Sequence, residues 1–536
     1  MSHPVNMNQM SFRAAFLWLV SFAILYAGIM IPSWNLGHLD FGDGNYMYIS
    51  WRVANGALLY QDILAPQPPI HFLIGCGLIK LGGLFSHPLY AFRLYSLLLH
   101  LLSMFLVYSC TVRMATGDDR DCSGQWRAAG VWAALLYLLV PIGYWWTSGY
   151  QSEPTEMAFI LGAFYLVMYF KGWQAFFAGV LMALAVLTNM TAAPYALFIG
   201  FGLLIRKPRL SLSYWAAFVP IVFLTFFAME QWTGACIENV FQNQVGSYPR
   251  PELLPKGVGV TGYFRNKLLT EGLDILHLEG GFILLGLFGM LTYITRGSVS
   301  TRIREFVATF TFCAMLSFLY VTKGGTVDYI FSIAEPFVAI IGGWFILWYW
   351  RMGAPIMGTL KPSGDNLSMC AWWGSMLLIL IVILYPGMSH NYATWAQKSY
   401  ECPEYETMQI VREITDAAPN ENDLVLVPPH YAFIAQRKIA LDYSELLLWT
   451  LKYLNENLDK VDGRAKQTVR KLANMITKGE IAFIALDLNQ TAKIPEIKTA
   501  IDTYYKPLRE KPVRTLNTSL EFYVPREKSQ PTVTAQ

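Results

Sequence analysis

The chain has 536 residues, of which 54% are hydrophobic and only 14% are charged, and its mean hydropathy is +0.36. About a quarter of the residues of an average soluble domain are charged, so this composition excludes an ordinary soluble protein and indicates lipid as the main solvent. The net charge of +3 is too small to favour nucleic acid as a partner.

Eleven apolar runs predict membrane-spanning helices, because a straight span needs about 20 mostly apolar residues. They lie near 13–33, 88–110, 128–145, 155–170, 174–189, 191–205, 210–229, 279–295, 305–321, 331–350 and 369–387. The first is too long for the apolar part of a signal peptide and has no clear cleavage site, so we expect it to be retained as a span. A twelfth run, 69–85, is interrupted by Lys80 and four glycines. We expect it to lie in the interface or to re-enter the membrane.

The positive charges between these runs predict the topology. With an inner N-terminus, Lys and Arg fall in alternate loops, which the positive-inside rule places in the cytoplasm. These residues are Arg113, Arg120 and Arg127; Lys171; Arg206, Lys207 and Arg209; Arg296, Arg302 and Arg304; and Arg351 with Lys361. The segments 34–87, 146–155, 230–278 and 322–330 and the tail from about 388 are then outside. Counting 69–85 as a span would break this alternation.

The polar tail predicts a small α/β domain, 388–525, outside the membrane, followed by a disordered end, 526–536. Helical patterns at 404–417, 445–457 and 464–478 alternate with strand-like runs at 423–429, 438–443, 481–488 and 519–525. The tail has no cluster of Asp, His or Cys with catalytic spacing, and its His430 stands alone. We therefore expect this domain to be accessory to chemistry carried by residues 1–387.

The first outer loop, 34–87, concentrates groups that suit chemistry at a membrane surface. Asp40 and Asp43 follow the first span directly, around the start of an amphipathic helix predicted at 46–57. Acids beside an interfacial helix can meet a lipid-linked substrate at the level of its headgroup. A sugar transfer needs one such carboxylate as a base, because an acceptor hydroxyl or amine is a weak nucleophile until its proton is removed. The alternative is that Asp43 merely caps the helix, which Asp does well.

An ordered set of residues in this loop resembles a known family. In chain order they are Gly42, Asp43, Tyr46, Gly56, Tyr60, Asp62, Pro68 and Pro69. The set resembles the first outer loop of GT-C glycosyltransferases, and among them the bacterial relatives of dolichyl-phosphate-mannose–protein mannosyltransferase and the lipid A aminoarabinose transferase. Arg93, Glu153 and the stretch 322–337 also resemble these proteins. Gln67, where the family often has a basic residue, and Asp328, where it often has His, depart from the pattern.

The resemblance implies a polytopic α-helical membrane protein with a GT-C-like fold, about 11 transmembrane helices and interfacial helices in its outer loops. The small C-terminal α/β domain completes the expected architecture. The implied activity is that of an inverting glycosyltransferase, which takes a sugar from a polyprenyl-phosphate donor on the periplasmic face of the inner membrane. The sugar stays open, as does the acceptor, which could be a lipid, a glycan or a protein. Asp43 is then the expected base, with Asp40 as its local rival.

Other acids in the outer loops are expected to serve the acceptor. Asp62, Glu153 and Glu156 could position it or hold a divalent metal, and no other cofactor is expected; two carboxylates alone do not make a metal site. The alternative for Glu153 and Glu156 is an ordinary acidic first turn of a helix that begins around Pro154.

Cations in the outer loops are expected to bind the donor phosphate. They are Arg265, Lys267 and Lys323, together with the phenol of Tyr329. The alternative is that these cations contact the headgroups of anionic membrane lipids. Arg93, near the outer end of a span, is expected to pair with a loop carboxylate, since an unpaired charge near lipid is costly.

A transporter or flippase of lipid-linked or small polar solutes is the alternative function. It predicts ionisable side chains or broken helices at mid-membrane, in two related halves. The predicted spans are nearly free of charge, whereas the acids lie in outer loops. A non-catalytic scaffold would not explain why aspartates gather beside an interfacial helix. Consumption of a polyprenyl-phosphate sugar by the purified protein separates these hypotheses.

Overall fold

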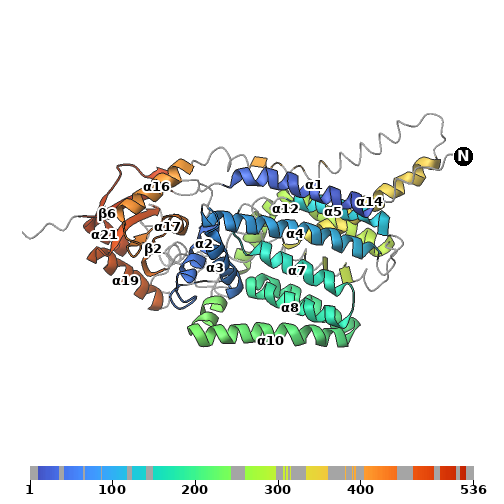
Figure 1. Cartoon of the computed structure of the whole chain (residues 1–536), viewed down its shortest axis with the longest axis horizontal. Helices are drawn as coiled ribbons and strands as arrows, with labels where there is room; N and C mark the ends of the chain where they lie inside the picture. Colours follow the sequence, from blue (N-terminus) through green and yellow to red (C-terminus); the bar gives the residue numbers. More distant parts are fainter. Residues whose placement is uncertain are drawn as a thin grey trace, which may run out of the picture.

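The computed structural model of the chain describes residues 10–34, 41–63, 65, 67–85, 87–116, 123–140, 149–242, 260–296, 306–307, 310–311, 314, 333–359, 381, 385, 389, 392–393, 404–442, 463–487, 495–514 and 519–526. Within these ranges the protein consists of a bundle of long helices and an α/β part at one end of it (Figure 1). The predicted spans near 305–321 and 369–387 lie mostly outside the described residues. The helix predicted at 445–457 and residues 527–536 lie entirely outside them.

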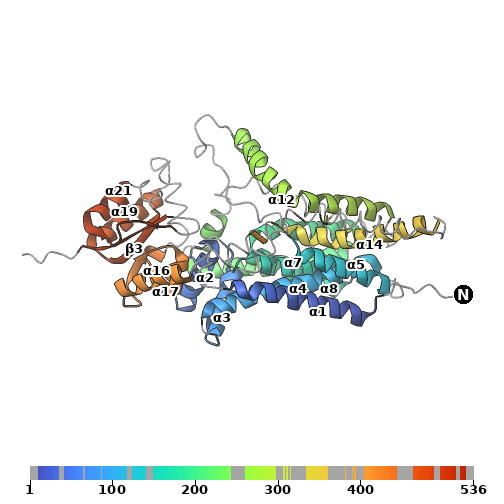
Figure 2. The same ribbon diagram turned by 90° about the horizontal axis from the view of Figure 1, so that it is seen from above.

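The bundle is made of helices that run beside one another in both ribbon views (Figures 1 and 2). They are α1 (Phe12–Met30), α4 (Pro88–Thr116), α5 (Ser123–Leu138), α7 (Glu153–Val167), α8 (Gly172–Thr188), α9 (Ala193–Arg206), α10 (Pro208–Thr233), α12 (Val260–Arg296) and α14 (Glu335–Thr359). Each overlaps one of the predicted apolar runs. Among the described residues, α1, α4, α10 and 276–295 of α12 are long and apolar enough to cross a membrane. The helices fit a helical membrane protein, while the count of eleven spans stays a prediction.

Proline and glycine define the ends of helices in this bundle. Pro88 and Pro208 open α4 and α10, where the missing N–H removes no intrahelical hydrogen bond. Helix α10 ends at Gly234, whose φ of 65° lies in the left-handed region that favours glycine. These features explain why the helix bounds follow the sequence pattern closely here.

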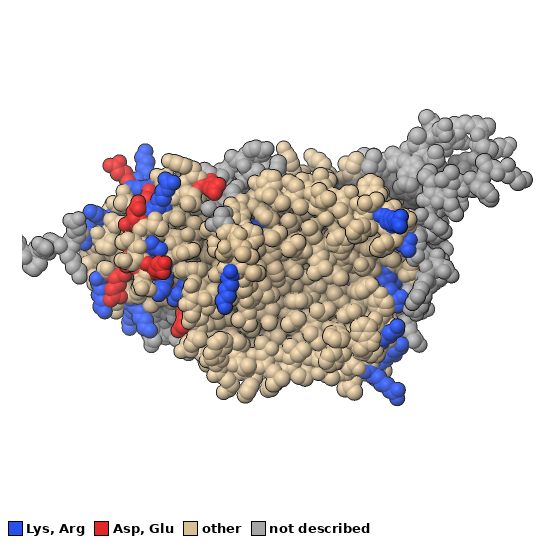
Figure 3. Space-filling model, in the orientation of Figure 1, with Lys and Arg blue, Asp and Glu red and all other residues tan. Residues whose placement is uncertain are grey.

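Side chains inside the bundle are closely packed, and those outside are apolar. Gly343 of α14 faces α5, where an added Cβ would come within 2.5 Å of the carbonyl oxygen of Ala129, so this approach requires glycine. On the outside, Trp18, Phe223 and Leu291 are 53%, 64% and 60% exposed. Figure 3 shows a broad uncharged belt between Lys and Arg at one end of the bundle and charges of both signs on the α/β part. Such a surface suits lipid.

Two shorter helices, α2 (Phe41–Ala54) and α3 (Pro69–Gly82), lie at the end of the bundle beside the α/β part (Figure 1). Helix α2 begins five residues before the start predicted from the sequence at 46, so the prediction was wrong at this end. It ends close to the predicted place, just before Gly56, whose φ is 93°. At about 1.5 Å per residue, the 14 residues of α3 are too few to cross a bilayer upright.

The C-terminal part contains a six-stranded sheet. Its strands are β1 (Leu424–Leu426), β2 (Lys438–Ile439), β3 (Ile481–Asp487), β4 (Tyr505–Pro507), β5 (Val513–Arg514) and β6 (Ser519–Pro525). Their order is β2-β1-β3-β6-β4, and β5 also pairs with β6. Strand β1 runs parallel to β2 and β3, whereas β6 is antiparallel to β3, β4 and β5. The four predicted strand-like runs contain β1, β2, β3 and β6, while β4 and β5 are too short to show a pattern.

Helices cover both faces of this sheet. They are α16 (Glu404–Ala417), α17 (Pro429–Ala435), α19 (Gly463–Lys478) and α21 (Pro495–Tyr504). Val425 and Phe483 are buried with residues of α16 and α17, whereas Leu426 and Ile484 are buried with residues of α19 and α21. Successive strand residues therefore point to opposite faces, as the period of two requires.

Candidate active site

Asp43 lies in the first turn of α2 and is 1% exposed. Its Oδ2 lies 2.8 Å from Nη1 of Arg93 on α4, which is equally buried, and its Oδ1 accepts a hydrogen bond from the backbone N–H of Tyr150. The carboxylate is thus engaged by groups outside α2. Because α2 begins at Phe41, Asp43 stands inside the helix, and the alternative in which it is merely the cap is wrong.

The Asp43–Arg93 pair confirms the prediction that Arg93 pairs with a loop carboxylate. A charge buried without a counter-charge is very costly, and each member of this ion pair supplies the counter-charge of the other. The pair joins α2 to α4, and Tyr150 joins both to the segment before α7. Three parts of the chain that are far apart in sequence therefore meet at one carboxylate.

Glu153 and Glu156 lie in the first turn of α7, as the helix-start alternative predicts. Nδ2 of Asn189, at the end of α8, lies 3.4 Å from Oε1 of Glu153 and 3.0 Å from Oγ of Ser152. The hydroxyl of Thr191 donates to the carboxylate of Glu156 at 2.7 Å. These acids hold the end of α8 against the start of α7, and Glu153 follows Tyr150 by three residues.

Asp62 lies apart from this cluster in the described contacts. It is exposed, and its Oδ2 accepts the backbone N–H of Leu58 at 2.8 Å, which closes a local turn. Among the described residues, no three His, Cys, Asp or Glu side chains gather in a way that could hold a metal ion. The described contacts of Asp62 and Glu153 are with other residues, Leu58 and Asn189, and none joins the two acids.

Most of the predicted cation site lies outside the described residues, namely Lys323, Tyr329 and the side chain of Lys267. Asp40, the rival base, lies outside them as well. Arg265 is exposed on the N-terminal half of α12, which stands away from the bundle in Figure 2. Its guanidinium makes no described contact with Asp43 or Arg93.

An aromatic stack that the sequence analysis missed lies against Asp43. The imidazole of His71, on α3, is parallel to the ring of Tyr150 with centroids 4.3 Å apart, and meets the edge of Tyr46 at 4.8 Å. The hydroxyl of Tyr150 donates to the carbonyl oxygen of His71 at 2.6 Å. Burial lowers the pKa of His71 to about 3, so its ring is neutral. Asp43, Arg93, Tyr46, His71 and Tyr150 are called the Asp43 cluster below.

The C-terminal part holds α2 directly. Arg52 of α2 donates from Nε and Nη2 to the two carboxylate oxygens of Asp442 at 2.9 and 2.8 Å, and the hydroxyl of Tyr48 donates to Asp442 at 2.6 Å. One turn before Tyr48, a Cβ added to Gly44 would lie 2.3 Å from the Cβ of His430, so the two backbones approach as closely as glycine allows. The domain expected to be accessory to the chemistry therefore contacts the helix that carries Asp43.

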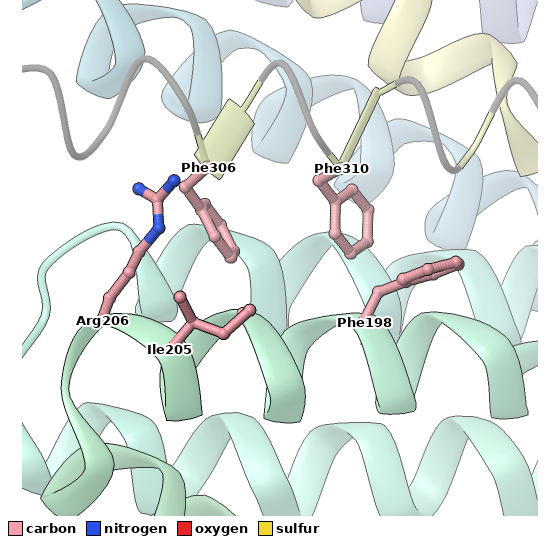
Figure 4. A pocket seen from close by; sticks show the side chains of 6 residues that line it. Phe198, Ile205, Arg206, Phe306 and Phe310 are labelled. Atoms are coloured by element: carbon pink, nitrogen blue, oxygen red, sulfur yellow. The ribbon is translucent and has the colours of Figure 1, made fainter.

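A separate pocket lies between α9 and residues 306 and 310 (Figure 4). Its walls are Phe198, Gly202, Ile205, Phe306 and Phe310, with Arg206 at its edge. It shares no residue with the Asp43 cluster and is almost entirely apolar, so it is not the candidate active site.

Solved structures share the architecture of this chain. ArnT from Cupriavidus metallidurans bound to undecaprenyl phosphate is 14% identical, with a TM-score of 0.55 over 96% of this chain and 98% of that one. Its apo state gives a TM-score of 0.54. The archaeal oligosaccharyltransferase AglB from Archaeoglobus fulgidus, in complex with an inhibitory peptide and a dolichol-phosphate, is 15% identical, with a TM-score of 0.52 over 97% of this chain and 75% of that one. No family model and no curated protein sequence matches. The chain has a GT-C-like fold, as the residue pattern of 34–87 predicts.

Proposed function

We propose, from this GT-C-like fold, that the chain is a membrane glycosyltransferase that takes a sugar from a polyprenyl-phosphate donor and inverts its anomeric carbon. The ArnT and AglB structures were solved with undecaprenyl phosphate and a dolichol-phosphate, which supports a lipid-linked donor for this chain too. The acceptor is a lipid, a glycan or a peptide.

The geometry of Asp43 is the observation that carries the proposal. The guanidinium of Arg93 supplies the counter-charge that a buried ionised carboxylate needs, and the N–H of Tyr150 fixes its orientation. A carboxylate offers about four lone-pair positions, more than these two contacts use, and in its ionised form it can take the proton of an acceptor hydroxyl or amine. Asp43 would take that proton as the acceptor atom bonds to the anomeric carbon, while the bond from that carbon to the phosphate oxygen breaks.

The remaining site residues keep supporting roles in this proposal. Glu153, buried and three residues after Tyr150, would position the acceptor, and Glu156 would fix the start of α7. The leaving phosphate needs no proton. Its charge would be stabilised by Arg265, Lys267 and Lys323 and by a hydrogen bond from the phenol of Tyr329. Asp62 would shape the loop between α2 and α3. Asp40 remains the rival base.

The test is consumption of a polyprenyl-phosphate sugar by purified protein in detergent, with release of polyprenyl phosphate. A transferase transfers the sugar or hydrolyses it slowly, whereas a transporter leaves the donor intact and moves it across vesicles. One observation favours the transporter hypothesis: Glu279 of α12 and Glu335, the first residue of α14, are 1% and 0% exposed within the bundle. Ionisable side chains inside the bundle are one part of what that hypothesis predicts. An intact donor together with its movement across vesicles would refute the transferase.

The proposal places the active site and residues 388–525 outside the inner membrane. Figure 3 supports this, because Lys and Arg gather at the end of the bundle away from the α/β part, as the positive-inside rule requires of a cytoplasmic end. In a cysteine-free background, exposed cysteines at Asn55 and Glu421 should react with a membrane-impermeant thiol reagent in intact spheroplasts. A cysteine at Lys171 should react only after permeabilisation. The opposite pattern would invert the topology.

A further inference from the structure

His71 is a buried imidazole without a polar partner. Its side chain is 0% exposed, and neither Nδ1 nor Nε2 has a hydrogen-bond partner among the described residues. In folded proteins the large majority of buried polar side-chain atoms are hydrogen-bonded, and an unsatisfied one lowers stability. The ring therefore needs an explanation other than packing, because Phe or Leu would fill the same space without that loss.

The position of His71 ties it to the candidate base. Its ring lies between Tyr150, whose backbone N–H holds Asp43, and Tyr46, which follows Asp43 by three residues on the same face of α2. Asp43 and His71 are both at most 1% exposed, so the two side chains are buried in one cluster and are linked through Tyr46 and Tyr150.

The charge state of His71 narrows what it can bind. Burial lowers its pKa to about 3, so the ring carries no charge to offer a phosphate. A neutral imidazole has one N–H donor and one acceptor nitrogen, and a hydroxyl likewise donates one bond and accepts others. The ligand chemistry that matches this pair of atoms is an alcohol.

We propose that His71 hydrogen-bonds a hydroxyl of the transferred sugar and so helps to place its anomeric carbon beside Asp43. This rests on the proposed function, since it assumes that the site holds a sugar. The imidazole acts as a binding contact, and Tyr46 and Tyr150 set the plane of its ring. Neither nitrogen has a partner among the described side chains and backbone groups, so both are available to a sugar hydroxyl.

The test compares His71→Phe with the wild type for two kinds of ligand. The probes are undecaprenyl phosphate and its mannose, glucose and galactose derivatives, with binding measured as the ligand-induced rise in melting temperature. His71→Phe should lose about three- to ten-fold in affinity for the best sugar derivative and keep its affinity for undecaprenyl phosphate, which has no sugar hydroxyl. The ligand-free variant should melt at the wild-type temperature or above it, because two unsatisfied polar atoms are gone.

His100→Phe is the matched control. His100 is also fully buried, but its Nδ1 lies 3.1 Å from the hydroxyl of Tyr137. His100→Phe should therefore lower the melting temperature. It should leave the ratio of the affinities for the sugar derivative and for undecaprenyl phosphate unchanged. Equal affinity of His71→Phe and wild type for the sugar derivative would overturn the inference. So would a wild type that binds no sugar derivative more tightly than undecaprenyl phosphate. Sugar-selective binding without any transfer would instead refute the proposed transferase and leave the contact standing.

Discussion

Asp43→Asn is expected to lower turnover by about 10²–10⁴-fold, the range that general-base catalysis typically contributes. Asn keeps the shape of Asp and an oxygen that can accept the N–H of Tyr150, but it cannot take a proton from the acceptor. Donor affinity should stay near the wild-type value, because the phosphate is expected to be held by other residues. Turnover and donor affinity of the purified variant, measured below its melting temperature, provide the test.

Two other aspartates are controls for this experiment. Asp62→Asn changes an exposed side chain that closes a local turn, so its turnover should stay near that of the wild type. Asp40→Asn tests the rival base. If Asp40→Asn is inactive and Asp43→Asn has normal turnover, Asp40 is the base. If both variants have normal turnover, neither aspartate is the base, and the proposed role of this loop is wrong.

Arg93→Met is expected to destabilise the protein strongly, by about 3–5 kcal/mol, because it leaves the carboxylate of Asp43 buried without its counter-charge. The stem of Met fills much of the space of the Arg stem, so lost volume accounts for little of the effect. Thermal unfolding in detergent should show a clearly lower melting temperature, and turnover should fall as well.

The double variant Asp43→Asn with Arg93→Met separates charge from packing. It leaves no buried charge without a partner, so it should melt well above Arg93→Met alone while it remains inactive. Arg265→Met, at an exposed position of α12, should not change the melting temperature. A single Arg93→Met variant as stable as the wild type would mean that this ion pair does not hold α2 to α4.

Local features of the sequence were enough to predict much of the fold. Pro88 and Pro208 open helices, and Gly56 follows α2. The continuous apolar run 481–486 predicts β3, and apolar residues at every second position from Leu520 predict β6. The sequence predicted that a loop carboxylate would pair with Arg93, because an unpaired charge near lipid is costly, but it did not show which carboxylate. The start of α2 was not predictable, since residues 41–45 carry no clear helical period, and that error is what left Asp43 as a candidate cap.

The rest of the cluster depends on contacts between distant parts of the chain. His71 and Tyr150 are 79 residues apart, and Arg52 and Asp442 are 390 apart. No periodicity or spacing links such residues, and a lone His after a Pro pair gives no sign that a tyrosine ring will stack on it. Single-sequence patterns show which segments form helices and strands, but the partners of a buried polar group emerge only when those segments pack.

The hold of Asp442 on α2 also determines where the chain can be divided. A fragment that ends at 387 keeps all five residues of the Asp43 cluster but loses both Asp442 and His430. Arg52 and Tyr48 would then lose their partner Asp442. Helix α2 would lose its contacts with α17 and keep those with α3. The bundle is therefore not a self-contained module. Another C-terminal domain could replace the native one only if it offered an acid to Arg52 and left room for the backbone at Gly44.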